Sequence, residues 1–374
     1  MKRILEVFGE PIISGGQEAF VNNVIENINW ENLCIDLFTP YYCNNDLYRK
    51  NISDRGGKIY EANLDFKPGS SRFNIRKPLD EVLKHEKYDV VHVHSGSVSV
   101  LSIVSEVAKK NKVKIIIVHS HSPAEHETFK HMLVKIWFYR VMKMYPTYYF
   151  ACSLNAALCK FPRKIALDKT KFIKNGINLD KYKFDIEKRK KIRKYLKLNE
   201  KDYLIGHVGR FSKEKNHKFL IEIIDKLSML DRNVKLLLVG DGELKKDIEE
   251  QVKKRNLIKN VIFTGNVANV DEYMQAMDCF VLPSLYEGLP FVGVEAQASG
   301  MPIIVSNGVS CELKLTNSVE YEELKVEKWI EKIRKSKNKR RCDNILELKK
   351  AGFDITETAN ILRKIYFENV HSYF

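Results

Sequence analysis

Two glutamates, Glu287 and Glu295, lie in a stretch whose pattern predicts a strand, a loop, a helix and a second strand. The stretch covers residues 284–306 and reads SLYEGLPFVGVEAQASGMPIIVS, with Pro290 expected to open the helix and Gly300 to close it. In open α/β sheets, ligands bind at the loop that follows a strand. The N–H groups of a helix start attract an anion, and a carboxylate accepts hydrogen bonds from hydroxyls. The pattern therefore predicts a site for a ligand that carries both a phosphate and a polyol.

The same stretch resembles the signature of nucleotide-sugar glycosyltransferases of the GT-B type, especially the large retaining family 4. In that family two glutamates flank seven residues around a Gly-Leu-Pro, and the two glutamates here match that spacing. The resemblance implies that Glu287 contacts the donor sugar as a catalytic residue and that Glu295 holds the ribose. It also places Gly288, Leu289 and Pro290 at the donor. Without the resemblance, the two glutamates are a loop carboxylate in water and a solvated helix position.

Two cations precede a predicted helix in the second half of the chain. Arg210 and Lys215 follow the predicted strand 203–208, and the helix is expected to begin near Asn216. A guanidinium and an ammonium beside a helix N-terminus make an effective clamp for a diphosphate. The alternative is two surface cations in a chain that has 63 Lys and Arg residues. Family 4 places an Arg and a Lys of this pattern on the donor phosphates, so the resemblance implies a catalytic role for both.

Two further loops are assigned to the donor by the same resemblance. Gly15 and Gly16 follow the first predicted strand and precede a helix, where the backbone can approach a phosphate closely. A Gly-Gly pair at this position faces the donor diphosphate in the family. The loop after the predicted strand 261–264 approaches the nucleobase there, which implies that Asn266 and Val267 frame the base.

Histidines end two of the predicted strands in the first half of the chain. His92 and His94 alternate on one strand, whereas His119 and His121 lie where the next strand runs out into a loop. Such a histidine is often structural, with no part in chemistry. In the resembling family a histidine at the end of the second of these strands faces the reacting centre of the sugar. His119 matches that position, with His121 as the alternative.

A His-x-His pair also suggests a metal site. Apart from Glu125 and Glu127 in the following loop, no acidic or cysteine ligand clusters near these histidines, and the seven cysteines form no C-x-x-C pair. We therefore expect reduced thiols, no metal and no cofactor besides the nucleotide-sugar substrate. Cationic side chains would instead stabilise the leaving diphosphate.

The composition limits the class of protein. The 374 residues suffice for two domains, and no N-terminal signal or run of about 18 apolar residues is visible, so we expect a cytoplasmic protein. The net charge of +15 admits nucleic acid, an anionic membrane surface or an anionic substrate as partner, although an AT-rich genome explains part of the lysine excess. Aromatic and basic residues interleave at 133–150, which predicts a core helix leading to the strand 148–152, with membrane contact as the alternative. The region of Arg72, Arg76 and Lys77 is an equal candidate for such contact. The basic helix 186–198 reads as a solvated face.

Alternating strands and helices predict an α/β fold with doubly wound parallel sheets. The resemblance implies the GT-B arrangement, two Rossmann-like domains facing a cleft. We expect residues 1–178 to form the N-terminal acceptor-binding domain, with a C-terminal helix in 355–374 packing back on it. Residues 179–354 would form the domain that binds the nucleotide-sugar donor.

The expected activity is retaining transfer of a sugar, most often from a UDP-sugar in this family, to a glycan or lipid-linked acceptor of a surface polysaccharide such as a capsule or exopolysaccharide. Three other classes of protein share some of these features. A glycoside hydrolase would need no phosphate clamp. A GT-B nucleotide-sugar epimerase would need no acceptor. A basic nucleotide- or nucleic-acid-binding protein would explain the charge, but the chain has no zinc-finger or RNA-binding aromatic signature.

Overall fold

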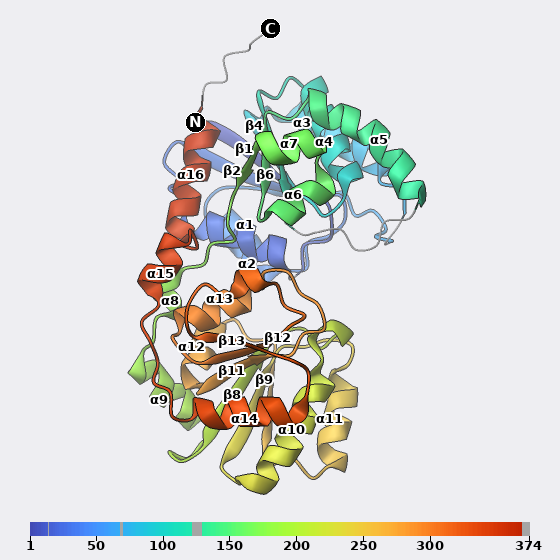
Figure 1. The fold of residues 1–374 in the computed structure, drawn as a ribbon. Coiled ribbons are helices and arrows are strands. Elements are labelled where there is room, and N and C mark those ends of the chain that lie inside the picture. Colours follow the sequence, from blue (N-terminus) through green and yellow to red (C-terminus); the bar gives the residue numbers. More distant parts are fainter. Residues whose placement is uncertain (14, 68–69, 122–128, 369–374) are drawn as a thin grey trace. The chain divides into compact units, whose positions relative to one another are not determined.

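The computed structural model describes residues 1–13, 15–67, 70–121 and 129–368 (Figure 1). The chain forms two compact units, one from Met1–Gly176 together with the segment that starts at Ile355, and the other from Ile177–Asp354. Each unit has one sheet of parallel strands covered by helices, as the alternating pattern predicted. Within the described residues, no helix is both long enough and apolar enough to cross a membrane.

The first unit contains a seven-stranded sheet in the order β3-β2-β1-β4-β5-β6-β7. The chain builds outward from β1 in one direction and then returns to build outward from β4 in the other, so the switch point lies between these two strands. Ligands of doubly wound sheets bind at such a point, outside the carboxyl ends of the strands. The strands are β1 (Lys2–Phe8), β2 (Leu33–Thr39), β3 (Ile59–Glu61), β4 (Val90–His94), β5 (Ile115–Ser120), β6 (Tyr148–Ala151) and β7 (Thr170–Phe172).

The two faces of this sheet differ in character. One face carries valines and isoleucines of the central strands, which form a continuous apolar core with α3, α4, α5 and α6. The other face carries a carboxylate and several histidines beneath α1 and α16. The helices are α1 (Gly16–Asn27), α2 (Asp46–Ser53), α3 (Arg76–His85), α4 (Val98–Lys110), α5 (Phe129–Met144), α6 (Leu154–Lys160), α7 (Arg163–Asp168) and α16 (Ile355–Phe367), with a 3₁₀ turn η1 (Phe73–Ile75).

The last helix, α16, belongs to the first unit although the whole second unit separates it from the rest in sequence. It contacts α1 and β1, and Figure 1 shows it running beside them. Its apolar side chains recur at helical spacing and are buried, so they extend the core of this unit. They are Ile355, Ala359, Leu362, Ile365 and Tyr366.

The second unit contains a six-stranded sheet in the order β10-β9-β8-β11-β12-β13, with its switch point between β8 and β11. The central strands are almost wholly apolar because helices bury both faces. The strands are β8 (Tyr203–Val208), β9 (Val234–Val239), β10 (Val261–Gly265), β11 (Cys279–Leu282), β12 (Ile303–Ser306) and β13 (Val319–Glu322).

The predicted order of strand, loop, helix and strand around the two glutamates is confirmed as β11, α13 and β12. Pro290 immediately precedes α13, and Gly300 adopts the left-handed φ of +72° that ends it. The helices of this unit are α8 (Leu179–Tyr182), α9 (Ile186–Tyr195), α10 (His217–Leu230), α11 (Lys245–Lys254), α12 (Val270–Ala276), α13 (Phe291–Ala298), α14 (Val326–Ser336) and α15 (Ile345–Lys350), with 3₁₀ turns η2 (Lys213–Lys215) and η3 (Cys311–Leu313).

The interpretation of α9 as a solvated face is wrong for two of its arginines. Arg189 and Arg193 pair with Asp278 at 2.5 and 3.2 Å, and their side chains are only 20% and 11% exposed. Both also donate to the carbonyl of Ala276, at the end of α12. The positive face of α9 therefore neutralises the carbonyl end of a neighbouring helix.

Candidate active site

The loops that follow β8 and β11 flank the switch point of the second unit and bring together Lys215 and Glu287. The ammonium of Lys215 donates a short hydrogen bond to one carboxylate oxygen of Glu287, and Ser284 Oγ donates to the other at 2.8 Å. Both charged side chains are less than one-fifth exposed. The backbone of Glu287 is fixed as well, because its N–H and C=O bond to Gly308 and Ser310 at 2.9 Å each. Glu287 is therefore a positioned group and not a loop carboxylate in water.

Arg210 lies on the same loop but makes a different contact. Its side chain is 74% exposed, and its Nε lies 3.4 Å from a carboxylate oxygen of Glu243. The two predicted clamp residues thus have separate acidic partners in this structure. Their joint contact with a diphosphate remains a prediction.

Two buried histidines lie behind Lys215 and were not singled out from the sequence. His207 Nδ1 donates to the carbonyl of Val281 at 2.8 Å, and His217, at the first position of α10, stacks on Phe211 with ring centroids 4.1 Å apart. Burial, followed by the charge of Lys215, lowers the pKa of His217 to about 4. The pKa of His207 is also well below its usual value because of burial. Both rings are neutral at neutral pH, so Lys215 carries the positive charge at this helix start.

Glu295 lies in α13 and accepts a hydrogen bond from the phenol of Tyr182 in α8 at 2.8 Å. Burial raises the pKa of Glu295 to about 7, although the hydrogen bond from Tyr182 acts in the opposite direction. The side chain is half-buried, not the solvated helix position of the simpler reading. Tyr182 was missed because nothing in the sequence pairs positions 113 residues apart.

The remaining predicted donor residues of the second unit lie on its loops. Gly288 is exposed, and a methyl group added to it would meet no atom within 4 Å, so the structure shows no steric need for glycine there. Leu289 packs against the core of the unit just before Pro290. Asn266 is exposed and Val267 half-buried directly after β10.

In the first unit, Gly15 and Gly16 start α1, but a carboxylate already lies there. A methyl group added to Gly15 would come within 2.6 Å of Oε2 of Glu18. Burial raises the pKa of Glu18 to about 7, and it also raises the pKa of the neighbouring Glu10. An anion approaching this helix start would therefore meet Glu18, and the predicted diphosphate contact of the glycines requires this carboxyl to be protonated or to move.

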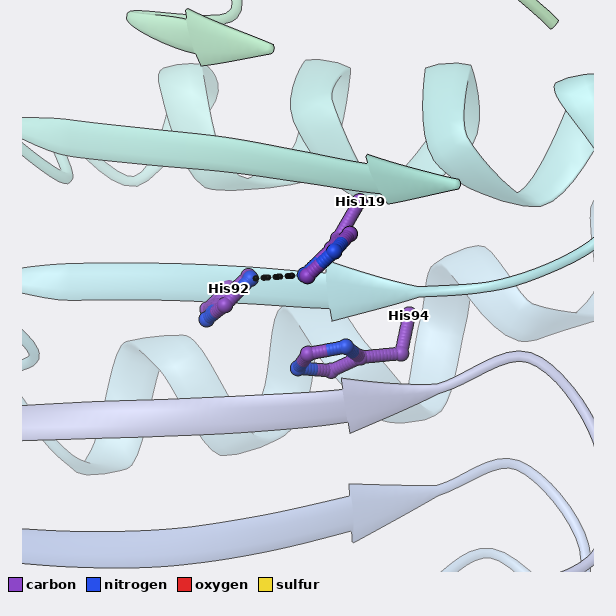
Figure 2. A group of neighbouring side chains, drawn as sticks. All are labelled: His92, His94 and His119. Carbon is purple, nitrogen blue, oxygen red and sulfur yellow. Dashed lines mark hydrogen bonds between the residues drawn. The ribbon is translucent and has the colours of Figure 1, made fainter. Parts of the chain in front are cut away.

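Four histidines come together on one face of the first sheet. They are His92 and His94 of β4, His119 of β5, and His121, which directly follows β5. His92 Nε2 lies 3.2 Å from His119 Nδ1, the contact drawn in Figure 2, and His94 Nδ1 lies 2.8 Å from His121 Nε2. Burial lowers the pKa of His94 to about 4 and lowers those of His119 and His121 well below the usual value. The catalytic position predicted for His119 is thus part of a buried cluster.

A carboxylate and a phenol complete this cluster, and neither was predicted. Glu6 on β1 lies 2.7 Å from His94 Nε2, and the Tyr366 hydroxyl of α16 donates to Glu6 at 2.8 Å. Burial alone would raise the pKa of Glu6, but the hydrogen-bonded His92 and His94 bring it below its usual value. The contact depends on strand order, since β1, β4 and β5 are neighbours and Glu6 is in register with His92, and the sequence alone does not give that order. Glu125 and Glu127, the acidic residues considered earlier, lie outside the described residues.

The sequence of this chain is similar to those of known glycosyltransferases. Residues 188–341 match the model of the family described as glycosyl transferases group 1. The chain is 29% identical over 316 residues to the putative glycosyltransferase EpsF of Bacillus subtilis (strain 168), which covers 83% of this chain and 80% of that protein. It is 31% identical over 247 residues to the UDP-Gal:alpha-D-GlcNAc-diphosphoundecaprenol alpha-1,3-galactosyltransferase of Escherichia coli, which covers 63% of this chain and 62% of that one.

The fold is also that of a solved structure. The crystal structure of Anabaena Alr3699/HepE in complex with UDP superposes with a TM-score of 0.75, covers 98% of this chain and 99% of that chain, and is 17% identical. Two Rossmann-like units of seven and six parallel strands are the GT-B fold, so the predicted fold class is confirmed. The residues that match this family model lie within the second unit, which holds Lys215, Glu287 and Glu295.

Proposed function

We propose that this chain, a glycosyltransferase with a group 1 domain, transfers a sugar from a UDP-sugar to a glycan or lipid-linked acceptor in surface polysaccharide biosynthesis, with retention of configuration. The observation that carries the proposal is the pairing of Lys215 with Glu287 at the switch point of the second unit. The name of the Escherichia coli relative supports a UDP-sugar and a lipid-diphosphate acceptor, and the UDP complex of the Anabaena structure supports the nucleotide.

The Lys215–Glu287 pair suggests how the donor is held. A diphosphate at the start of α10 would compete with Glu287 for the ammonium of Lys215, with Arg210 as the second cation. Once released from Lys215, the Glu287 carboxylate accepts hydrogen bonds from the hydroxyls of the donor sugar. The two cations then stabilise the negative charge that develops on the leaving diphosphate, which is the largest contribution in many enzymes.

The remaining roles follow from chemistry and from the family resemblance. Glu295 would accept hydrogen bonds from the ribose hydroxyls, for which it must be ionised. The leaving phosphate would take the proton of the acceptor hydroxyl on the same face, which gives retention without a covalent enzyme intermediate. No metal is needed where side-chain cations neutralise the diphosphate.

Peripheral contact with an anionic membrane at the cytoplasmic face fits a lipid-linked acceptor. In the first unit, the rings of Phe73 and Trp137 lie with centroids 6.4 Å apart, and each residue is 49% exposed. Arg76 lies over the Phe73 ring at 5.3 Å, and Arg140 is exposed on the same helix as Trp137. Exposed rings beside guanidinium groups suit the headgroup layer.

The experiment is a calorimetric comparison of UDP, GDP, ADP and several nucleotide sugars on the wild type and on Glu295→Ala and Arg210→Ala. We expect UDP to bind selectively and both variants to weaken it about tenfold or more, since each removes a contact worth more than about 1.4 kcal/mol. Lys218→Ala, which removes an exposed lysine of α10, is the matched control and should bind like the wild type. Equal binding of all nucleotides, or wild-type binding by both site variants, would contradict the donor site.

A further inference from the structure

We propose that Glu6, acting with Tyr366 through His92, fixes the tautomer of His119 so that its Nε2 is a hydrogen-bond acceptor for a hydroxyl of the donor sugar. Glu6 and His92 are positioning residues in this scheme, and His119 is the residue that touches the substrate. The assignment of the tautomer rests on the contacts of the first unit alone. The binding of a sugar hydroxyl by His119 Nε2 rests on the proposed function.

The argument starts from the buried carboxylate of Glu6. Its Oε1 lies 2.8 Å from the Tyr366 hydroxyl, and its Oε2 lies 2.7 Å from His94 Nε2 and 3.3 Å from His92 Nδ1. A carboxylate surrounded by three groups that can donate is ionised and accepts from all of them. The Tyr366 hydroxyl therefore donates its proton in a hydrogen bond to Glu6.

This hydrogen bond determines the proton positions of the first histidine pair, His92 and His119. His92 Nδ1 lies 2.8 Å from the Tyr366 oxygen, which has already given its proton to Glu6, so His92 Nδ1 must be the donor. We assign the neutral form to His92, in which Nδ1 carries the single proton and Nε2 is the acceptor. His119 Nδ1 lies 3.2 Å away, the contact drawn as a dashed line in Figure 2, and must donate to it. His119 Nε2 is left with a lone pair.

In the second pair, His94 and His121, each neutral ring likewise has one donor and one acceptor nitrogen. His94 Nε2 donates to Glu6, so His94 Nδ1 accepts from His121 Nε2 at 2.8 Å. This pair ends at His121 Nδ1, beside the side chain of Asn175. One carboxylate thus sets the proton positions of four rings, in two parallel chains.

The free nitrogen of His119 is the end that matters. It is buried and has no hydrogen-bond partner among residues 1–13, 15–67, 70–121 and 129–368. Phe20 packs edge-on against the His119 ring with centroids 5.0 Å apart, which holds the ring in this orientation. A buried lone pair without a donor is costly, and a sugar hydroxyl supplies the donor, whereas a phosphate or carboxylate oxygen would repel it.

A metal ion is the competing use of these rings. One nitrogen from each of His92, His94 and His119 can be chosen so that all lie within 4.8 Å of one another. Zinc–nitrogen bonds of about 2.0–2.1 Å allow ligand atoms at most about 4.2 Å apart. The described geometry also needs a proton between His92 and His119, where a metal would require two lone pairs. The rings therefore suit the hydrogen-bonded arrangement, and elemental analysis tests for a metal.

The test is the tautomer of each histidine, read from two-bond ¹⁵N–¹H NMR correlations of the free protein. We expect protons on Nδ1 of His92 and His119 and on Nε2 of His94 and His121. In Glu6→Gln, the side-chain amide donates either to the Tyr366 oxygen, which turns the phenol proton toward His92 Nδ1, or to His92 Nδ1 directly. In both cases the first pair inverts and His119 Nε2 becomes protonated. Glu26→Gln, an exposed carboxylate of α1, should change none of the four rings.

The substrate half is tested by binding. We expect Glu6→Gln to bind UDP like the wild type but to lose, about tenfold, the extra affinity of a UDP-hexose over UDP. Absence of a proton on Nδ1 of wild-type His119, protons on both nitrogens of His92, an unchanged His92–His119 pair in Glu6→Gln, or stoichiometric metal by elemental analysis would overturn the tautomer assignment. An inverted pair with undiminished hexose affinity would overturn the role of His119 Nε2. Failure of UDP to bind at all would count against the proposed function, and the wild-type NMR result would still decide the tautomers.

Discussion

Lys215 and Glu287 illustrate how much one buried contact determines at the scale of single residues. Each side chain is mostly withdrawn from water, and each has the other as its opposite charge. Removing one member leaves the other charge buried without compensation, which costs more than the pair gains. The pair therefore couples the stability of the second unit to the charge state of the donor site.

Lys215→Met should lower the free energy of unfolding by about 1–3 kcal/mol, because Ser284 is the one side-chain partner that Glu287 then keeps among the described residues. Urea unfolding measures this loss. In a double-mutant cycle with Glu287→Gln, the two losses should be less than additive by about 1 kcal/mol or more. Lys218→Met, an exposed lysine on α10, should stay within about 0.5 kcal/mol of the wild type. Additive losses in the cycle would contradict the coupling.

Glu295 should make stability depend on pH in a direction opposite to most carboxylates. Burial raises its pKa from 4.5 to about 7, so the folded protein keeps this proton over a window in which the unfolded chain has lost it. The contribution of Glu295 to stability therefore falls as pH rises from 4.5 to 7, by on the order of 2–3 kcal/mol. Glu295→Gln cannot titrate, so the wild type should lose stability relative to this variant across the window. A stability difference that is independent of pH would refute the buried, protonated glutamate.

What the sequence could predict at this scale was the loop positions of the site residues, not their partners. Glu287 and Lys215 were assigned to the same ligand, and the structure brings them into contact because β8 and β11 are neighbours. Tyr182, which bonds Glu295, and Glu6, which bonds His94, come from elements far away in the chain. Local patterns contain no information on such pairs, since helix packing determines the first and strand order the second.

At the scale of elements, α9 shows why charge alone misleads. Its basic composition is the same whether its side chains face water or a buried acceptor. The structure directs Arg193 to Asp278, to the carbonyl of Ala276 and to that of Asp202 at 2.6 Å. The periods of strands and helices were predictable because burial imposes them, but the partner of a charged face depends on the packing of α12 against α9.

Arg193→Ala should destabilise the second unit by about 2–4 kcal/mol, because it leaves carbonyls and the carboxylate of Asp278 short of donors. Thermal unfolding monitored with hydrogen exchange would locate the loss at α12 and β8. Lys190→Ala on the same helix removes an exposed lysine that pairs with exposed Glu187, and should change stability by less than about 0.5 kcal/mol. Equal effects of the two substitutions would restore the interpretation of α9 as a solvated face.

At the scale of the whole molecule, the chain crosses from the first unit to the second near Gly176 and returns near Ile355. The helix α16 therefore completes the core of the first unit. Gly176 sits where these crossings meet, because a methyl group added to it would lie 2.9 Å from the Cα of Ile355. The fold of the first unit thus depends on residues at both ends of the sequence.

Tyr366→Phe tests this dependence with the loss of one oxygen atom. The phenol donates to Glu6 on β1 and contacts His92 on β4, so its removal takes a donor from a buried carboxylate and an acceptor from a buried ring. We expect the first unit to lose about 1–3 kcal/mol, seen as faster hydrogen exchange in β1, β4 and β5. Exchange in β8 and β9 of the second unit should be unchanged. Tyr148→Phe, whose hydroxyl bonds Glu368 at an exposed position, is the matched control and should leave both sheets as they are. A loss confined to the first sheet would show that α16 contributes to the stability of this sheet through the Tyr366 hydroxyl.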